Sequence, residues 1–287
     1  MKYLKKFATR AEYEAYMATN EDYPFVGYIA DEKKVEYVSP VNYAELPLHF
    51  IAEEDLEVSF SSNAIQYSLD NATWQALPAA TATPTISKGN KVYFRASGLS
   101  PKSDIGIGTF STTGKCSVAG NIMSLVDTDF VSLTTLQSNH FARLFKDCIG
   151  IVDAQKLVLP ATALTANCYS LTFMGCINLV NTPKLPATTL ATSCYNSMFR
   201  DCSSLVNAPE LPATALTTYC YSYMFSGCTN LRYIKAMFLT RPVNTYTANW
   251  VQNVAATGTF VKNAAATWNV TGVDAIPTGW TVETATE

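Results

Sequence analysis

Three copies of one unit follow each other in the second half of this chain, and they constrain its fold more than any other feature. They read LPATALTANCYSLTFMGC (159–176), LPATTLATSCYNSMFRDC (185–202) and LPATALTTYCYSYMFSGC (211–228). One such unit cannot bury its apolar face alone, so successive copies must stack to form a continuous core. The repeats therefore predict a solenoid, an architecture used more often for binding or building than for catalysis.

The spacing of the repeats is regular. Phe173, Phe199 and Phe225 recur at intervals of 26 residues, and leucine-rich repeats have periods of roughly 20 to 29 residues. Upstream, HFARLFKDC (140–148) has the same pattern with His140 in place of the first cysteine, which indicates a degenerate terminal copy. Within a unit we expect a short strand over SLVNAPELP, limited by its prolines, and about two turns of helix over CYSYMFSG.

These residues resemble the BspA-like leucine-rich repeats of bacterial surface proteins. Units of that family carry a leucine, a short strand ended by proline, and an aromatic-Phe-x-x-Cys-x-x-Leu segment. Here that segment reads YNSMFRDCSSL (195–205) and YSYMFSGCTNL (221–231), and the resemblance covers residues 141–240. The period is longer than is usual in that family, and the LPAT element resembles a variant from gut Bacteroidales and their phages. The resemblance implies adhesion or recognition.

The whole chain is predicted to be multidomain. Residues 1–45 are expected to form a small α+β module, and residues 126–240 the α/β leucine-rich-repeat solenoid. Between them, residues 46–125 alternate apolar and polar positions and predict an antiparallel β-sandwich with strands in LHFIA, LEVSFS, IQYSL, TWQAL, KVYFRAS, GTFSTTG and CSVAGNIMSL. Residues 241–287 hold three of the four tryptophans and predict an aromatic cap over the last repeat.

The N-terminal module carries two local signals. Thr9 and Glu12 have the spacing of a capping box ahead of a helix in AEYEAYM, and VGYIA and VEYVS flank a charged turn as in a β-hairpin. A helix and a hairpin bury little core, so this module is expected to dock on a partner or to form a homo-oligomer, with a trimer as one alternative. It resembles a short N-terminal module of predicted virion proteins in gut Bacteroidales phages, which implies attachment to other virion proteins.

Composition and sorting signals bear on location. Charged residues make up 15% of the chain and the net charge is −3, which gives no electrostatic reason to expect nucleic acid or an anionic membrane. No apolar run approaches the ~18 residues of a membrane helix, so no membrane insertion is expected. MKYLKK is followed by Arg10, Glu12 and Glu14 where a signal peptide needs apolar residues. We therefore expect a virion protein assembled in the bacterial cytoplasm, with the bacterial cell surface as the alternative.

The repeat cysteines are expected to be structural. Within a unit they lie eight residues apart, unlike the spacing of roughly two to four in zinc sites, so no metal is expected. Stacking would align them in two columns, and a disulfide between columns would need suitable geometry. Buried free thiols are the favoured interpretation, because a protein assembled in the cytoplasm usually stays reduced. The expected core residues are Cys168, Cys176, Cys194, Cys202, Cys220, Cys228, Phe173, Phe199 and Phe225.

Catalytic groups are scarce. The two histidines, His49 and His140, fall in a predicted strand and in the repeat pattern, where a structural role is commoner than general-base catalysis. No nucleophile elbow appears, and Gly106-Ile107-Gly108 alone is weak evidence of phosphate binding. We therefore predict no enzyme, no catalytic residue and no cofactor.

Positions that vary between copies point to a binding surface. Lys184 and Glu210 occupy one strand position of successive copies, and Arg200 varies in the CYSYMFSG segment. An exposed sheet face is the usual binding surface of solenoids, although solvent-exposed positions vary freely as well. Two functions remain: a phage fibre or decoration protein displaying a surface for a host protein or glycan, and a bacterial BspA-like adhesin.

Overall fold

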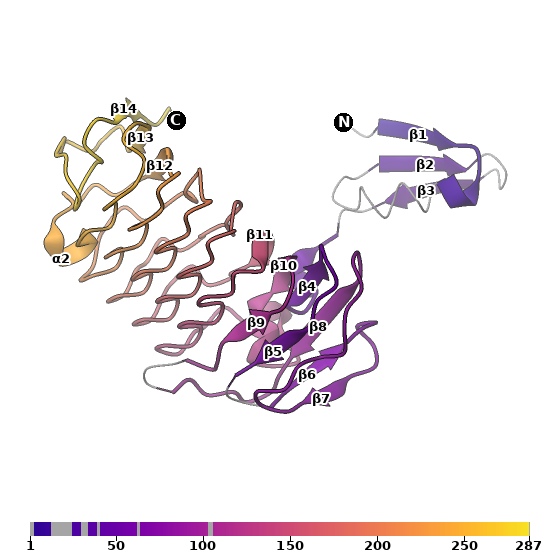
Figure 1. Cartoon of the computed structure of the whole chain (residues 1–287). Coiled ribbons are helices and arrows are strands. Elements are labelled where there is room, and N and C mark those ends of the chain that lie inside the picture. The colour runs from indigo at the N-terminus through magenta and orange to yellow at the C-terminus, as the bar shows by residue number, and fades with distance from the viewer. Residues whose placement is uncertain are drawn as a thin grey trace. The chain divides into compact units, whose positions relative to one another are not determined.

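The computed structural model describes residues 3–12, 25–29, 34–38, 41–61, 64–102 and 106–286. The chain divides into two compact units, Met1–Tyr43 and Ala44–Glu287. The described residues are mostly in strands, turns and loops, with several sheets and few helices (Figure 1). The division lies close to the boundary expected at residue 45.

The first unit contains a three-stranded sheet in the order β1-β2-β3, with β1 at Tyr3–Phe7, β2 at Phe25–Ile29 and β3 at Lys34–Val38. The antiparallel pairing of β2 with β3 confirms the expected hairpin. Strand β1 pairs with β2 in parallel and was not expected, because its lysines mask the strand pattern. Strand β2 thus lies in the middle of the sheet, with β1 on one side and β3 on the other.

Residues 10–12 are helical and begin at the expected cap. The Glu12 amide donates to Thr9 Oγ1 at 3.3 Å, and the Ala8 amide donates to Glu12 Oε2 at 2.8 Å. The first bond is half of a capping box, whereas the second comes from one residue before the position that this motif uses. The rest of the expected helix lies outside the described residues.

The second unit begins with a mostly antiparallel β structure. A six-stranded sheet has the order β11-β10-β4-β8-β6-β7, and β5 pairs with β9 separately. The strands are β4 (His49–Ala52), β5 (Val58–Phe60), β6 (Ile65–Ser68), β7 (Gln75–Leu77), β8 (Lys91–Arg95), β9 (Phe110–Thr112), β10 (Cys116–Asn121) and β11 (Ile151–Val158). Short 3-10 helices lie at Tyr43–Glu45, Ile122–Leu125 and Phe130–Ser132. Each run expected to hold a strand between residues 46 and 125 does so.

Phenylalanine rings hold the two sheets together. The ring of Phe110, on β9, lies 5.2 Å from that of Phe50 and 5.0 Å from that of Phe94, both on the larger sheet. Phe145, from the first repeat, joins the same cluster at 5.9 Å from Phe110. Strand β11 also pairs in parallel with β10. The regions expected at 46–125 and 126–240 therefore share one core, and no break marks the boundary between them.

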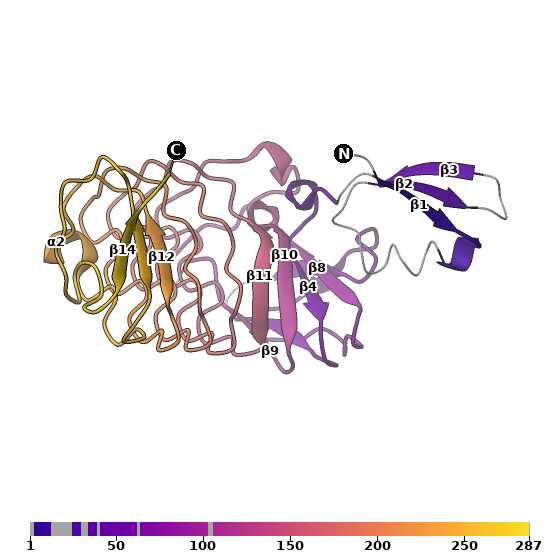
Figure 2. The same ribbon diagram turned by 90° about the horizontal axis from the view of Figure 1, so that it is seen from above.

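The repeats form a stack of coils, in which each coil contributes one chain turn (Figures 1 and 2). The rings of Tyr169, Tyr195 and Tyr221 lie 5.8 and 6.0 Å apart along the stack. Phe145, Phe173, Phe199 and Phe225 form a second column, with ring centroids 5.1, 5.5 and 6.0 Å apart. The phenylalanine rings of this second column are fully buried. The two columns therefore supply the continuous core that a single unit lacks.

The prediction of a helix over CYSYMFSG is wrong. No helix occurs between residues 141 and 240, all of which the structure describes. These segments, at 167–175, 193–201 and 219–227, consist of consecutive turns, and we call them turn segments. A helix would use every amide within its own segment, whereas here alternate amides donate to the next coil, as Tyr195 does to the Cys220 carbonyl at 3.1 Å. Hydrogen bonding between coils thus replaces hydrogen bonding within a helix.

This backbone requires left-handed residues at regular places. In the first turn segment, φ is +55° at Asn167, +61° at Leu171 and +74° at Gly175. Such a conformation costs a non-glycine residue roughly 1–2 kcal/mol. The bonds to the neighbouring coil and the buried aromatic columns offset that cost. A prediction from local propensity counts the cost but not these contacts, and it therefore favours the helix.

Residues 241–287, expected as a cap, continue the stack. The parallel sheet β12-β13-β14 comprises Tyr233–Ala236, Thr259–Lys262 and Thr281–Thr284, and the short helix α2 spans Asn244–Thr247. The Trp250 ring follows Phe225 along the core at 6.0 Å. As expected of core residues, Trp250, Trp268 and Trp280 are buried.

Candidate functional site

A groove of about 490 Å³ lies on the side of the stack that carries β11 and β12, which we call the strand side. The strand expected over SLVNAPELP does not form there, since its residues make only isolated bridges at Asn207 and Leu211. The polar lining of the groove comes from Gln155, Thr182, Lys184 and Glu210, and Leu185 contributes apolar surface. Pro183, Pro186, Pro209 and Pro212 complete it. We call it the proline groove. Two of the three candidate binding residues, Lys184 and Glu210, are thus brought together.

The groove forms where two proline-rich segments face each other. Residues 183–186 read PKLP in one coil and residues 209–212 read PELP in the next. No backbone hydrogen bond joins 181–187 to 207–213, two stretches that the structure describes in full. Proline has no amide hydrogen to donate, so two facing PxLP segments lose the donors that a ladder between them would need.

The neighbouring coils remain bonded on the same side. Ala154 donates to the Asn181 carbonyl at 2.8 Å on one flank of the groove. On the other, the Ala208 amide donates to Tyr233 at 2.9 Å and the Leu211 amide to Lys235 at 3.0 Å. On the first flank these bonds end at Asn181, and no backbone bond joins 155–161 to 182–187, so the ladder is open over PKLP on that side as well.

The groove has an uneven distribution of charge. Lys235 Nζ lies 3.1 Å from Glu210 Oε1, with 32% and 52% of the respective side chains exposed. Glu210 and Lys235 occupy equivalent positions of adjacent coils, because Leu211 pairs with Ala236. The exposed Lys184 forms no ion pair with any residue that the structure describes. Among the described residues, one positive charge in the groove thus has no ion-pair partner.

Lys235 was not expected in this site. Its coil lacks the LPAT motif, and its spacing of 25 residues from Glu210 differs from the repeat period. Aligning the coils on Leu211 and Ala236 instead of on LPAT would have found it.

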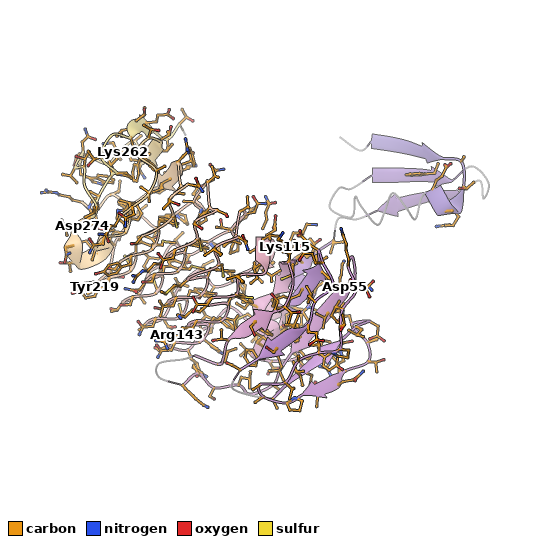
Figure 3. The ribbon with its side chains drawn as sticks, in the orientation of Figure 1. Asp55, Lys115, Arg143, Tyr219, Lys262 and Asp274 are labelled. Carbon is orange, nitrogen blue, oxygen red and sulfur yellow. The ribbon has the colours of Figure 1, made fainter. Side chains whose placement is uncertain are left out.

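Arg200, the third candidate, does not belong to the groove. Its Nε lies 3.4 Å from Asp201 Oδ2, and its guanidinium carbon lies 5.6 Å from the centroid of the Tyr223 ring. These partners lie in turn segments, the part of the stack where Figure 3 labels Tyr219. The structure therefore separates Arg200 from Lys184 and Glu210.

The cysteines lie in the interior. All eight are buried and none forms a disulfide. Cys176, Cys202 and Cys228 donate through Sγ to the carbonyls of Phe145, Phe173 and Phe199 in the preceding coil, at 3.1, 3.1 and 3.0 Å. Burial raises the pKa of Cys168 and of Cys220 to about 11. Since the thiolate is the reactive form, these thiols act as small apolar side chains and weak donors at neutral pH.

The histidines also lie away from the groove. His140 is buried, its ring stacks on Phe141 at 4.8 Å, and its Nδ1 accepts a bond from the Gln137 amide at 3.2 Å. Burial lowers its pKa to about 4. His49 is buried on β4, where Nδ1 lies 2.9 Å from the Pro47 carbonyl oxygen, to which it donates. Neither ring is placed to serve a ligand in the groove.

In the described part of the chain, no group of three or more His, Cys, Asp or Glu side chains gathers in a way that could hold a metal ion. In the same residues, no helix has both the length and the apolar character needed to cross a membrane.

Comparison with family models, with curated proteins and with solved structures gave no match.

Proposed function

We propose that this protein is a non-enzymatic structural protein of a phage virion, a fibre or decoration protein. Its repeats display a surface for recognition of a host protein or glycan, and residues 1–45 attach it to other virion proteins. The observation that carries the proposal is the division into a small unit, Met1–Tyr43, and a long unit with one continuous core. That unit presents an open groove on one face.

We infer further that the stack is a BspA-like leucine-rich-repeat solenoid. Support comes from the leucines that recur in the motif: Leu179, Leu205 and Leu231 are fully buried at equivalent places in successive coils. The coils also keep one hydrogen-bonding register along the turn segments. A stack of this kind offers an extended binding surface and a rigid spacer.

A homo-oligomer, with a trimer as the simplest fibre symmetry, belongs to the same proposal. The first unit spans only residues 1–43, and a unit of this size buries so small a fraction of its surface that it is marginally stable alone. Light scattering on the purified protein at several concentrations tests this, and a monomer at all concentrations contradicts it.

The attachment proposal is tested with phage particles. A phage encoding the chain without residues 1–43 is compared with one encoding the full chain, and the protein is quantified in purified particles by mass spectrometry. We expect the shortened protein to be made and folded but absent from particles. Equal incorporation of both forms contradicts attachment through the first unit.

The resemblance to BspA-like repeats favours a second candidate, a bacterial surface adhesin. Cell fractionation separates the two. A virion protein appears in released particles, whereas an adhesin appears in the envelope of bacteria that carry no active phage.

A further inference from the structure

We propose that the proline groove binds an acidic oligosaccharide, through a carboxylate on one of its sugar rings. This inference rests on the proposed recognition function and names the ligand class. The size of the groove is suitable, because ligand pockets span roughly 300–1,000 Å³ and the groove has about 490 Å³.

The charge of the groove selects an anion. Lys184 lacks an ion-pair partner among the described residues, while the Lys235 ammonium is held 3.1 Å from Glu210. A ligand carboxylate at Lys184 would gain a charge-assisted hydrogen bond. The chain as a whole carries a net charge of −3, so general electrostatic attraction does not draw anions to it, and local geometry must do so.

The rest of the lining suits a sugar ring. The rings of Pro186 and Pro212, the more exposed prolines of the groove, offer apolar contact to the C–H face of a pyranose. The Thr182 hydroxyl and the Gln155 amide offer hydrogen bonds to its hydroxyls. A few polar groups among apolar ones is the usual composition of a small-molecule site.

The gap in the ladder argues for a sugar and against a peptide. An added peptide strand pairs with one open sheet edge. Here the unbonded stretches 181–187 and 207–213 belong to adjacent coils of one stack. Each is bonded to the coil on its other side, at Ala154–Asn181 and at Leu211–Lys235, so neither is an open sheet edge. Hydroxyl groups, which donate and accept, can bridge two such stretches within a short distance.

Calorimetric titration of the full chain with trigalacturonate tests the proposal, with the neutral trimer of galactose as the comparison. We expect the acidic trimer alone to bind. Lys184→Met keeps the aliphatic stem but removes the charge, and it should weaken binding about tenfold or more. Lys88→Met, the same change at an exposed lysine outside the groove, should leave binding unaltered.

A second variant, Glu210→Gln, should raise the affinity for trigalacturonate instead of lowering it. It removes the carboxylate that repels the ligand and releases Lys235 from its ion pair, so trigalacturonate should bind severalfold more tightly. A gain in affinity cannot come from misfolding, which keeps the test decisive if Lys184→Met proves unstable.

Several results would overturn the inference. These are no binding of trigalacturonate, equal binding of the neutral trimer, equal losses in Lys184→Met and Lys88→Met, or weaker binding by Glu210→Gln. Stronger binding of a penta-glutamate peptide at the same groove would assign it to acidic peptides instead. Particle incorporation is measured separately, so failure here leaves the virion proposal standing, and failure there leaves the sugar site standing.

Discussion

The two sides of the same pair of coils differ in how they are held together. On the turn side, the amides of Ser193, Tyr195, Ser197 and Phe199 each donate to the next coil at 2.8–3.1 Å. On the strand side, between 181–187 and 207–213, no backbone bond forms. The two coils are thus joined by backbone hydrogen bonds on the turn side, which we call the sealed side. They are not joined between 181–187 and 207–213, which we call the open side. The difference teaches that a stack held by its core and one ladder can leave the other face free for binding.

The largest expected effect comes from breaking the sealed side. Phe199→Ala removes a fully buried ring between two stacked neighbours and should lower the free energy of unfolding by about 3–5 kcal/mol. Pro186→Ala, on the open side at an exposed position, should change it by less than about 1 kcal/mol. Urea unfolding of both variants checks this, and similar losses would contradict the contrast.

The pH dependence of the free energy of unfolding tests the role of His140, which lies in the first copy of the repeat. Burial lowers the pKa of His140 to about 4, whereas an unfolded histidine titrates near 6.5. The neutral ring therefore favours the folded state, and this stability, fully present above pH 6.5, is lost as the pH falls towards 4. Over that range the loss is at most roughly 3 kcal/mol.

The matched variant is His140→Cys, which places there the residue found in the inner copies. Other groups also titrate in acid, so the relevant quantity is the difference between the two proteins in urea unfolding at pH 7 and pH 4.5. The variant should lose less stability on acidification. Parallel pH profiles would rule out the histidine as the cause.

A smaller effect concerns the left-handed positions of the turn side. At Gly227, φ is +79° and an added Cβ would lie 2.1 Å from Asp201 Oδ1. Gly98 has φ of +71° but no atom within 4 Å of an added Cβ. Gly98→Ala should cost about 1 kcal/mol through the backbone alone, and Gly227→Ala should cost about 1 kcal/mol more, because the Asp201 side chain must move away. Equal melting temperatures would show that the side chain yields without cost.

The smallest effect on stability is expected on the open side. Glu210→Gln breaks an ion pair that is substantially exposed, so the free energy of unfolding should change by less than about 0.5 kcal/mol. The same variant is expected to change ligand affinity, and the two measurements together separate binding from folding. A large loss of stability would mean that the pair holds the coils together.

Short-range patterns predicted much of this fold. Alternation located the strands between residues 46 and 125, because one face of each strand packs on the core. The repeats predicted stacked coils with buried Phe199 and Cys194. The helix was the main error, since local residue preferences do not reveal that alternate amides bond to another coil. Strand β1 was missed for a different reason, because its two lysines mask the strand pattern.

Two of the three candidate binding residues came together because equivalent positions of a stack must lie side by side. By itself, the sequence determined the repeat, the apolar columns and the position of PKLP over PELP, since these depend on residue identity and period. Tertiary structure decided that the turn segments are not helices, that Lys235 approaches Glu210, and that Arg200 turns to Asp201. These outcomes depend on which backbone donors find partners in the neighbouring coil, and that pairing exists only once the coils are stacked.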